Sequence, residues 1–112
     1  MKVIVTPFAQ KQINKTASYI QREFGKTSRR SFMQKVRDIK QLLTINPYLG
    51  PVEPYLLDLP STYRSVVVAH LNKIVYRIEN ERIEVVDFWD CRREPEKQAA
   101  ETIANNDPAD SQ

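Results

Sequence analysis

The chain has 112 residues, of which 41% are hydrophobic, so we expect one domain that buries roughly two-thirds of the surface of the unfolded chain. No segment approaches the roughly 18 apolar residues of a membrane span, and the apolar run at residues 1–5 is too short for a secretory signal. These patterns predict a cytoplasmic protein with no membrane partner. The single cysteine, Cys91, and the single histidine, His70, exclude an internal disulfide and a Cys/His zinc cluster, and no cofactor is expected.

Positive charge is concentrated in the first part of the chain. Residues 94–112 hold five acidic residues and one lysine, a net charge of −4, whereas residues 1–93 hold 16 Lys and Arg against 9 Asp and Glu, a net charge of +7. A surplus of this size favours an anionic partner such as a nucleic acid or an acidic protein. Ordinary solvated surface charge is the alternative explanation.

Residues 1–5 are predicted to form a short strand, and Thr6 followed by Pro7 is typical of a helix start. Apolar residues then recur at every third or fourth position, which predicts an amphipathic helix of about four turns. Gly25 suits the left-handed residue that ends such a helix. The predicted apolar face consists of Ala9, Ile13, Ala17, Ile20 and Phe24.

A second amphipathic helix is predicted to follow, with Thr27 or Ser28 as its cap and Asn46 and Pro47 at its end. Because the connection is short, the two helices should form an antiparallel hairpin whose apolar faces meet one core. The face of the second helix is predicted to consist of Phe32, Val36, Ile39, Leu42 and Leu43.

The remaining chain is predicted to be mostly β-structure. Residues 47–61 contain four of the seven prolines and form an irregular connection, and residues 63–70, 74–79 and 83–89 read as three strands of an antiparallel meander. Alternation along the middle strand turns Ile74, Tyr76 and Ile78 toward the helices, so we expect polar groups on the opposite face.

The C-terminal part is predicted to be weakly structured. Residues 96–104 form at most a weak helix, and residues 105–112 are polar and predicted to be frayed. The sequence therefore predicts a domain over residues 1–97 and a weakly helical to disordered tail over residues 98–112.

Four segments, in this order, carry a resemblance to a known family. They are residues 9–25, with the Tyr-Ile and Phe-Gly pairs; residues 46–50, Asn-Pro-Tyr-Leu-Gly; residues 63–66, Tyr-Arg-Ser-Val; and residues 75–78 followed by residues 88–95, which end in Arg-Arg-Glu-Pro. Over about residues 2–97 the chain thus resembles the RelE/ParE superfamily of toxins of type II toxin–antitoxin systems, which includes the ParE-like plasmid stabilisation proteins.

The resemblance implies an α+β fold: an N-terminal strand, an antiparallel helix hairpin and a three-stranded antiparallel meander. It also implies a cognate antitoxin that wraps the toxin in a hetero-oligomer, and growth arrest as the outcome. ParE-type members inhibit DNA gyrase, whereas RelE-type members cleave ribosome-bound mRNA without a metal. Because both branches share the fold, the fold cannot choose between them.

Metal-independent RNA cleavage needs a base, an acid and cations around the phosphate. If the chain is a nuclease, the resemblance places the cations at Arg64, Lys73 and Arg93. The family's tyrosine or histidine beyond the arginine pair is absent from residues 94–103, which leaves His70 and Tyr63 as candidate substitutes for the acid or base.

Each of these residues also has a structural interpretation. Arg64 and Arg93 would pair with one of the acidic residues Asp58, Asp87 and Asp90, and His70 would be exposed and uninvolved beside a turn. Tyr76 and Trp89 are interpreted as buried strand residues.

A cluster of cations covers the turn of the predicted hairpin and its second helix. A solvated helix face is one interpretation, and contact with an acidic antitoxin or with a nucleic acid backbone is the other. The cluster consists of Arg22, Lys26, Arg29, Arg30, Lys35, Arg37 and Lys40.

We favour a ParE-like toxin that inhibits DNA gyrase, because the long hairpin resembles that branch and the C-terminal acid or base is missing. Both a non-enzymatic inhibitor and a metal-independent enzyme stay open at this point. The alternatives are a RelE-like, ribosome-dependent mRNA endoribonuclease and a degenerate, non-toxic relative that only binds its antitoxin.

Overall fold

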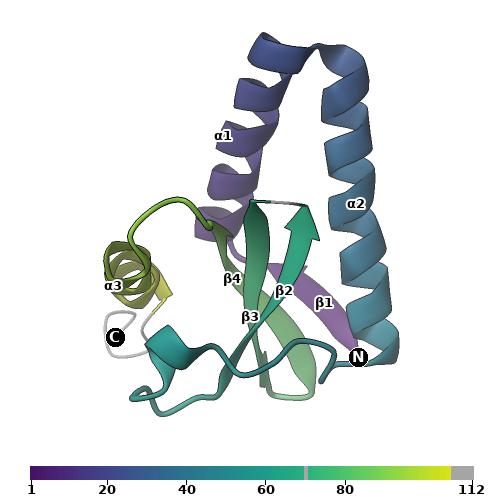
Figure 1. Cartoon of the computed structure of the whole chain (residues 1–112). Coiled ribbons are helices and arrows are strands. Elements are labelled where there is room, and N and C mark those ends of the chain that lie inside the picture. The colour runs from purple at the N-terminus through teal and green to yellow at the C-terminus, as the bar shows by residue number, and fades with distance from the viewer. Residues whose placement is uncertain (70, 107–112) are drawn as a thin grey trace.

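The computed structural model describes residues 1–69 and 71–106. In chain order its elements are β1 (Lys2–Val5), α1 (Pro7–Phe24), α2 (Lys26–Ile45), the 3₁₀ turn η1 (Pro54–Leu56), β2 (Tyr63–Ala69), β3 (Asn72–Glu79), β4 (Arg82–Asp90) and α3 (Pro95–Asn106). Figure 1 shows α1 and α2 side by side, and the end at which they join extends beyond the sheet. The predicted α+β order of one strand, a helix hairpin and three strands is confirmed.

The four strands form one sheet in the order β1-β4-β3-β2. β2, β3 and β4 are the predicted antiparallel meander, and β1 pairs with β4 in parallel. The turn between β3 and β4 is tight, because Asn80 and Glu81 both have positive φ values, 52° and 59°. In the β3–β4 pairing Val75 lies opposite Asp87 and Tyr76 opposite Val85, so Val86 is the additional residue of a β-bulge.

Local sequence signals place the start of α1 and the turn of the hairpin. The hydroxyl of Thr6 accepts a hydrogen bond from the Ala9 amide at 3.2 Å, as predicted for a helix cap. Gly25, with φ at +94°, is the single residue between the helices. The prediction that Thr27 or Ser28 caps α2 is wrong, since Gly25 itself occupies the cap position without a side-chain hydrogen bond.

The main core lies between the helix hairpin and one face of the sheet. Ile13, Phe32 and Ile74 are nearly inaccessible to solvent there, as the periodicity predicts. Phe24 and Leu42, which the same periodicity placed on the apolar faces, are 67% and 48% exposed. Phe24 lies at the end of the hairpin that extends beyond the sheet, and Leu43 takes the buried position beside Leu42.

A second core covers the opposite face of the sheet, so the prediction of a polar second face is wrong. Val75, Trp89 and Leu56 are buried in this core, which η1 and α3 close. Gln98 and Thr102 of α3 are buried against β4 as polar groups.

The prediction that the frayed ending begins at residue 105 is wrong, because α3 continues to Asn106, whose side chain donates a hydrogen bond to the Val86 carbonyl at 2.9 Å. Residues 107–112 lie outside the described residues, and the division of the chain at residue 97 stays a prediction.

Candidate functional site

Arg64 holds the loop that follows α2. Its guanidinium donates a hydrogen bond to the Gly50 carbonyl at 2.9 Å and lies 5.1 Å from the centre of the Tyr48 ring. The hydroxyl of the buried Tyr76 donates to the Pro47 carbonyl at 2.7 Å and accepts from the Gly50 amide at 3.0 Å. The predicted pairing of Arg64 with an aspartate is wrong, because the loop carbonyl takes that place.

Lys73 is paired with a carboxylate that the sequence did not single out. Its ammonium lies 2.7 Å from Glu53 Oε2 and 5.0 Å from the centre of the Trp89 ring. The Glu53 side chain is fully buried, and Ser65 donates a second hydrogen bond to the same oxygen at 2.7 Å. The pair therefore fastens the segment before η1 to the second face of the sheet.

Arg93 lies in the connection between β4 and α3. It forms an ion pair with Glu101 at 2.9 Å, and both side chains are 44% exposed. The aspartates predicted as its partners are engaged elsewhere: Asp90 pairs with Arg92 at 3.0 Å, and Asp87 is buried within the second core. Hydrogen bonds from Arg92 outweigh burial and hold the pKa of Asp90 below its usual value.

The described residues do not bring the three basic candidates together. Arg64 lies directly opposite Tyr76, a residue of the main core, whereas Lys73 lies directly opposite Trp89, a residue of the second core. Since residues paired across strands share a face of the sheet, Arg64 and Lys73 project from opposite faces. Arg93 lies beyond the end of β4, and the catalytic role of all three stays a prediction.

Of the two candidates for the acid or base, Tyr63 and His70, the structure describes only Tyr63. Tyr63 is 4% exposed, and its hydroxyl accepts a hydrogen bond from Arg77 at 3.0 Å. His70 lies outside the described residues, so its predicted role is untested. Tyr76 and Trp89, interpreted as buried strand residues, are 0% and 1% exposed, which confirms that interpretation.

A buried polar network joins β4 to α3. The Asp87 carboxylate accepts hydrogen bonds from the Thr102 hydroxyl, from the Trp89 indole at 3.1 Å and from the Phe88 amide at 2.6 Å. Burial raises the pKa of Asp87 above its usual value, although these hydrogen bonds act in the opposite direction. Sequence reasoning missed Thr102, because a polar residue in a short helix carries no periodic signal of burial.

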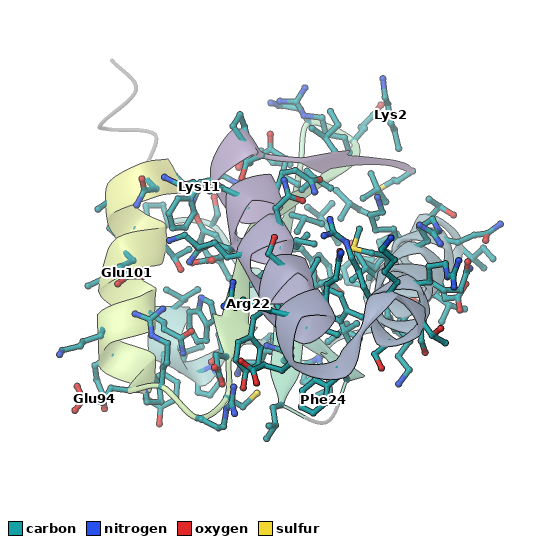
Figure 2. All side chains as sticks on the ribbon, turned by 90° about the horizontal axis from the view of Figure 1, so that it is seen from above. Lys2, Lys11, Arg22, Phe24, Glu94 and Glu101 are labelled. Carbon is teal, nitrogen blue, oxygen red and sulfur yellow. The ribbon has the colours of Figure 1, made fainter. Side chains whose placement is uncertain are left out.

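A cleft of about 480 Å³ lies between α1 and α3. Figure 2 shows α1 flanked by α3 on one side and by α2 on the other. Lys15 and Gln12 of α1 line the cleft opposite Glu101 and Asn105 of α3, and Phe88 of β4 also lines it. The cleft therefore has a cation, Lys15, on its α1 side and the ion pair of Arg93 and Glu101 on the opposite side.

Within residues 1–69 and 71–106, no group of three or more His, Cys, Asp or Glu side chains is arranged to hold a metal ion. Over the same residues, no helix is both long enough and apolar enough to cross a membrane.

One comparison with known proteins shows the family of this chain, and another shows a shared fold. Residues 3–95 match the family model of the ParE toxin of type II toxin-antitoxin system, parDE. A solved structure of the chromosomal ParDE TA system from P. aeruginosa is similar with a TM-score of 0.66 and 13% identity, over 80% of this chain and 95% of that chain. The YoeB/ParE toxin from Agrobacterium tumefaciens is similar with a TM-score of 0.54 and 20% identity, over 80% and 98%. No curated protein sequence matches. At these identities the two structures show the shared fold alone.

Proposed function

Because this chain belongs to the ParE toxin family of type II toxin–antitoxin systems, we propose that it inhibits DNA gyrase in the cytoplasm and is neutralised by a cognate antitoxin. In this proposal the toxin acts by binding and not by catalysis.

The observation that carries the proposal is the separation of Arg64, Lys73 and Arg93. A nuclease must aim its cations and its acid or base at one phosphate. Here Arg64 and Lys73 project from opposite faces of the sheet, and Lys73 is neutralised by the buried Glu53. This arrangement favours a binding inhibitor over a RelE-like endoribonuclease.

A second observation supports a protein partner. Leu42, Ile45 and Tyr48, at the end of α2 and in the loop that follows, are 48%, 78% and 62% exposed. Leu42 and Ile45 are three positions apart, so they share one side of the helix. Exposed apolar side chains gathered in one region are typical of a surface that a partner covers, and an antitoxin is the partner that we propose.

The decisive experiment compares two consequences of inducing the chain in bacterial cells. We expect gyrase-dependent DNA breaks or loss of supercoiling, measured on plasmid DNA, together with transcript ends that match those of uninduced cells. The purified chain should also inhibit the supercoiling reaction of purified gyrase.

The variant Arg64→Ala and its matched control Arg82→Ala test the alternative function, a RelE-like endoribonuclease, by the transcript cuts that each produces. Reproducible cuts within translated codons that disappear in Arg64→Ala and persist in Arg82→Ala would establish the endoribonuclease, because losing one well-placed cation typically costs about a hundredfold or more in rate. Soluble protein with neither effect would leave only the non-toxic, antitoxin-binding relative.

A further inference from the structure

The positive charge of the protein is concentrated in its helix hairpin. Residues 7–45 hold nine Lys and Arg against Glu23 and Asp38, a net charge of +7, whereas residues 46–93 hold six against seven, a net charge of −1. Residues 94–112 contribute −4. The molecule is therefore divided into a strongly basic hairpin and an acidic remainder.

Ion pairs divide the molecule in the same way. The six ion pairs of the described residues all use cations outside the hairpin, namely Lys73, Arg77, Arg82, Arg92 and Arg93. The arginines of α2 instead donate to neutral groups: Arg29 to Gln21 at 2.9 Å, Arg30 to Thr27 at 3.5 Å and Arg37 to Gln34 at 2.9 Å. These hydrogen bonds hold the guanidinium groups without neutralising them.

Six of the exposed cations of the hairpin form two rows. The α1 row, Lys11, Lys15 and Arg22, lines one shallow surface groove together with the polar residues Gln10, Asn14 and Ser18. Figure 2 shows Lys11 and Arg22 toward opposite ends of α1. The α2 row consists of Lys26, Arg30 and Arg37, whose spacing places them on one side of the helix.

The two rows are matched in length and lie on adjoining helices. In each row the first and last residues are eleven positions apart, or about 16 Å at the rise of an α-helix. The hydrogen bond between Arg29 and Gln21 joins the flanks of α1 and α2 close to both rows.

We propose that these rows bind the phosphate backbone of duplex DNA, without reading its sequence. Phosphate contacts require Lys and Arg, helped by the short polar side chains that accompany the α1 row. A protein partner would require an apolar centre, whereas Pro7 is the one apolar residue among those that line the groove of the α1 row. Proteins that bind single strands stack the bases on aromatic rings, and the described residues that line the groove of the α1 row include no aromatic ring.

The proposal makes a quantitative prediction about salt. Six cations that displace six counterions from DNA give a slope of about −5 for log K against log salt concentration. The affinity should therefore fall about a thousandfold between about 50 mM and 200 mM salt. This binding does not depend on which enzyme the toxin inhibits.

The test uses the purified full chain and a fluorescent 25-base-pair duplex of random sequence, about two and a half helical turns, with anisotropy measured over a salt series. The variant Lys26→Gln/Arg30→Gln/Arg37→Gln should reduce the slope by about three units. The matched control Arg82→Gln/Arg92→Gln/Lys97→Gln removes the same charge from outside the hairpin and should leave the slope within about one unit of wild type. Circular dichroism must show that both variants are folded.

Three results would overturn the proposal. The first is equal loss of affinity in the two variants, because only net charge would then matter. The second is polyglutamate competing with the duplex at equal charge concentration, which would indicate an acidic protein partner. The third is tighter binding of single-stranded RNA of equal length. Preference for the duplex, with loss confined to the hairpin variant, would support the proposal.

Discussion

The loop after α2 is fixed by a contact that only glycine permits. A Cβ atom on Gly50 would lie 2.4 Å from the Ser65 carbonyl oxygen and 2.7 Å from Val66 Cγ2. Arg64 and Tyr76 hold both backbone polar groups of Gly50 in this position. The glycine thus lets the loop approach β2 closely enough for the two side chains to bind it.

We expect Gly50→Ala to destabilise the fold by about 1 to 3 kcal/mol, because the added methyl group overlaps backbone that cannot easily move. Urea unfolding measures the change, and Ser18→Ala, at an exposed position of α1, serves as the control with an effect within about 0.5 kcal/mol. Equal stability of Gly50→Ala and wild type would show that the loop is held less closely.

Glu84 is the carboxylate whose charge the fold stabilises through two arginines. Arg77 Nε lies 2.9 Å from one carboxylate oxygen and Arg82 Nη2 lies 2.8 Å from the other. Burial alone would raise the pKa of Glu84, but these hydrogen bonds outweigh it and lower the pKa below the ordinary value of 4.5.

A lowered pKa in the folded state means that the native protein favours the charged carboxylate. The stabilisation is therefore present above pH 4.5 and is lost as the pH falls through the lower folded-state pKa. Glu84→Gln removes the titrating group, so the free energy of unfolding of wild type minus that of the variant should shrink on acidification. Urea unfolding over a pH series measures it. A difference independent of pH would contradict the prediction, and Glu96→Gln is an exposed control.

At the scale of elements, α3 is attached to the sheet mainly through polar groups. Gln98 accepts a hydrogen bond from the Asp90 amide and donates one to the Asp90 carbonyl, both at 2.8 Å. Thr102 contacts Asp87 and also accepts from the Trp89 indole at 3.0 Å. Ala99 adds apolar contact with the second core.

Thr102→Val keeps the shape of the side chain and removes the hydroxyl that joins Asp87 and Trp89. We expect a loss of about 1 to 3 kcal/mol, because a buried carboxylate loses a hydrogen-bond donor. Hydrogen exchange should accelerate most in the amides of α3. The control Thr62→Val, at an exposed position, should change neither quantity. Uniform acceleration over the whole chain would show that α3 does not open separately.

Sequence patterns predict those elements that have a regular hydrophobic periodicity and residues that mark where they begin and end. The cap at Thr6 and Pro7, the end of α2 at Asn46 and the three strands of the meander all agree with the structure. Each of these signals is local, so it can be recognised without knowledge of distant contacts.

The sequence does not predict the burial and the side-chain partners that depend on residues far apart in the chain. The burial of Glu53 is decided by Lys73 and Ser65, which approach it only in the folded sheet. Arg64 donates its hydrogen bond to the Gly50 carbonyl and not to one of the aspartates predicted as its partners. The reason is that Gly50 approaches β2 closely, which brings its carbonyl within hydrogen-bonding distance of Arg64. Partners in the candidate site are therefore a property of the tertiary structure.

At the scale of the whole molecule, membership of the ParE toxin family leads to a test in cells. We expect expression of the chain alone to arrest bacterial growth, and co-expression of the adjacent gene to relieve the arrest through an antitoxin that covers exposed apolar residues such as Ile45 and Tyr48. Colony counts after induction measure the effect. Normal growth at verified soluble expression would contradict an active toxin, and Ile45→Asp should weaken relief without weakening arrest.

The parallel pairing of β1 with β4 also determines when the chain can fold during synthesis. Lys2 pairs with Arg82 and Val5 with Val85, so the first strand waits for a partner that is translated some eighty residues later. Contacts of such long sequence separation form slowly, since the entropy of closing a large loop is lost before the contacts stabilise the fold. The nascent hairpin therefore leaves the ribosome with its apolar faces uncovered, and the core is completed only when β4 has emerged.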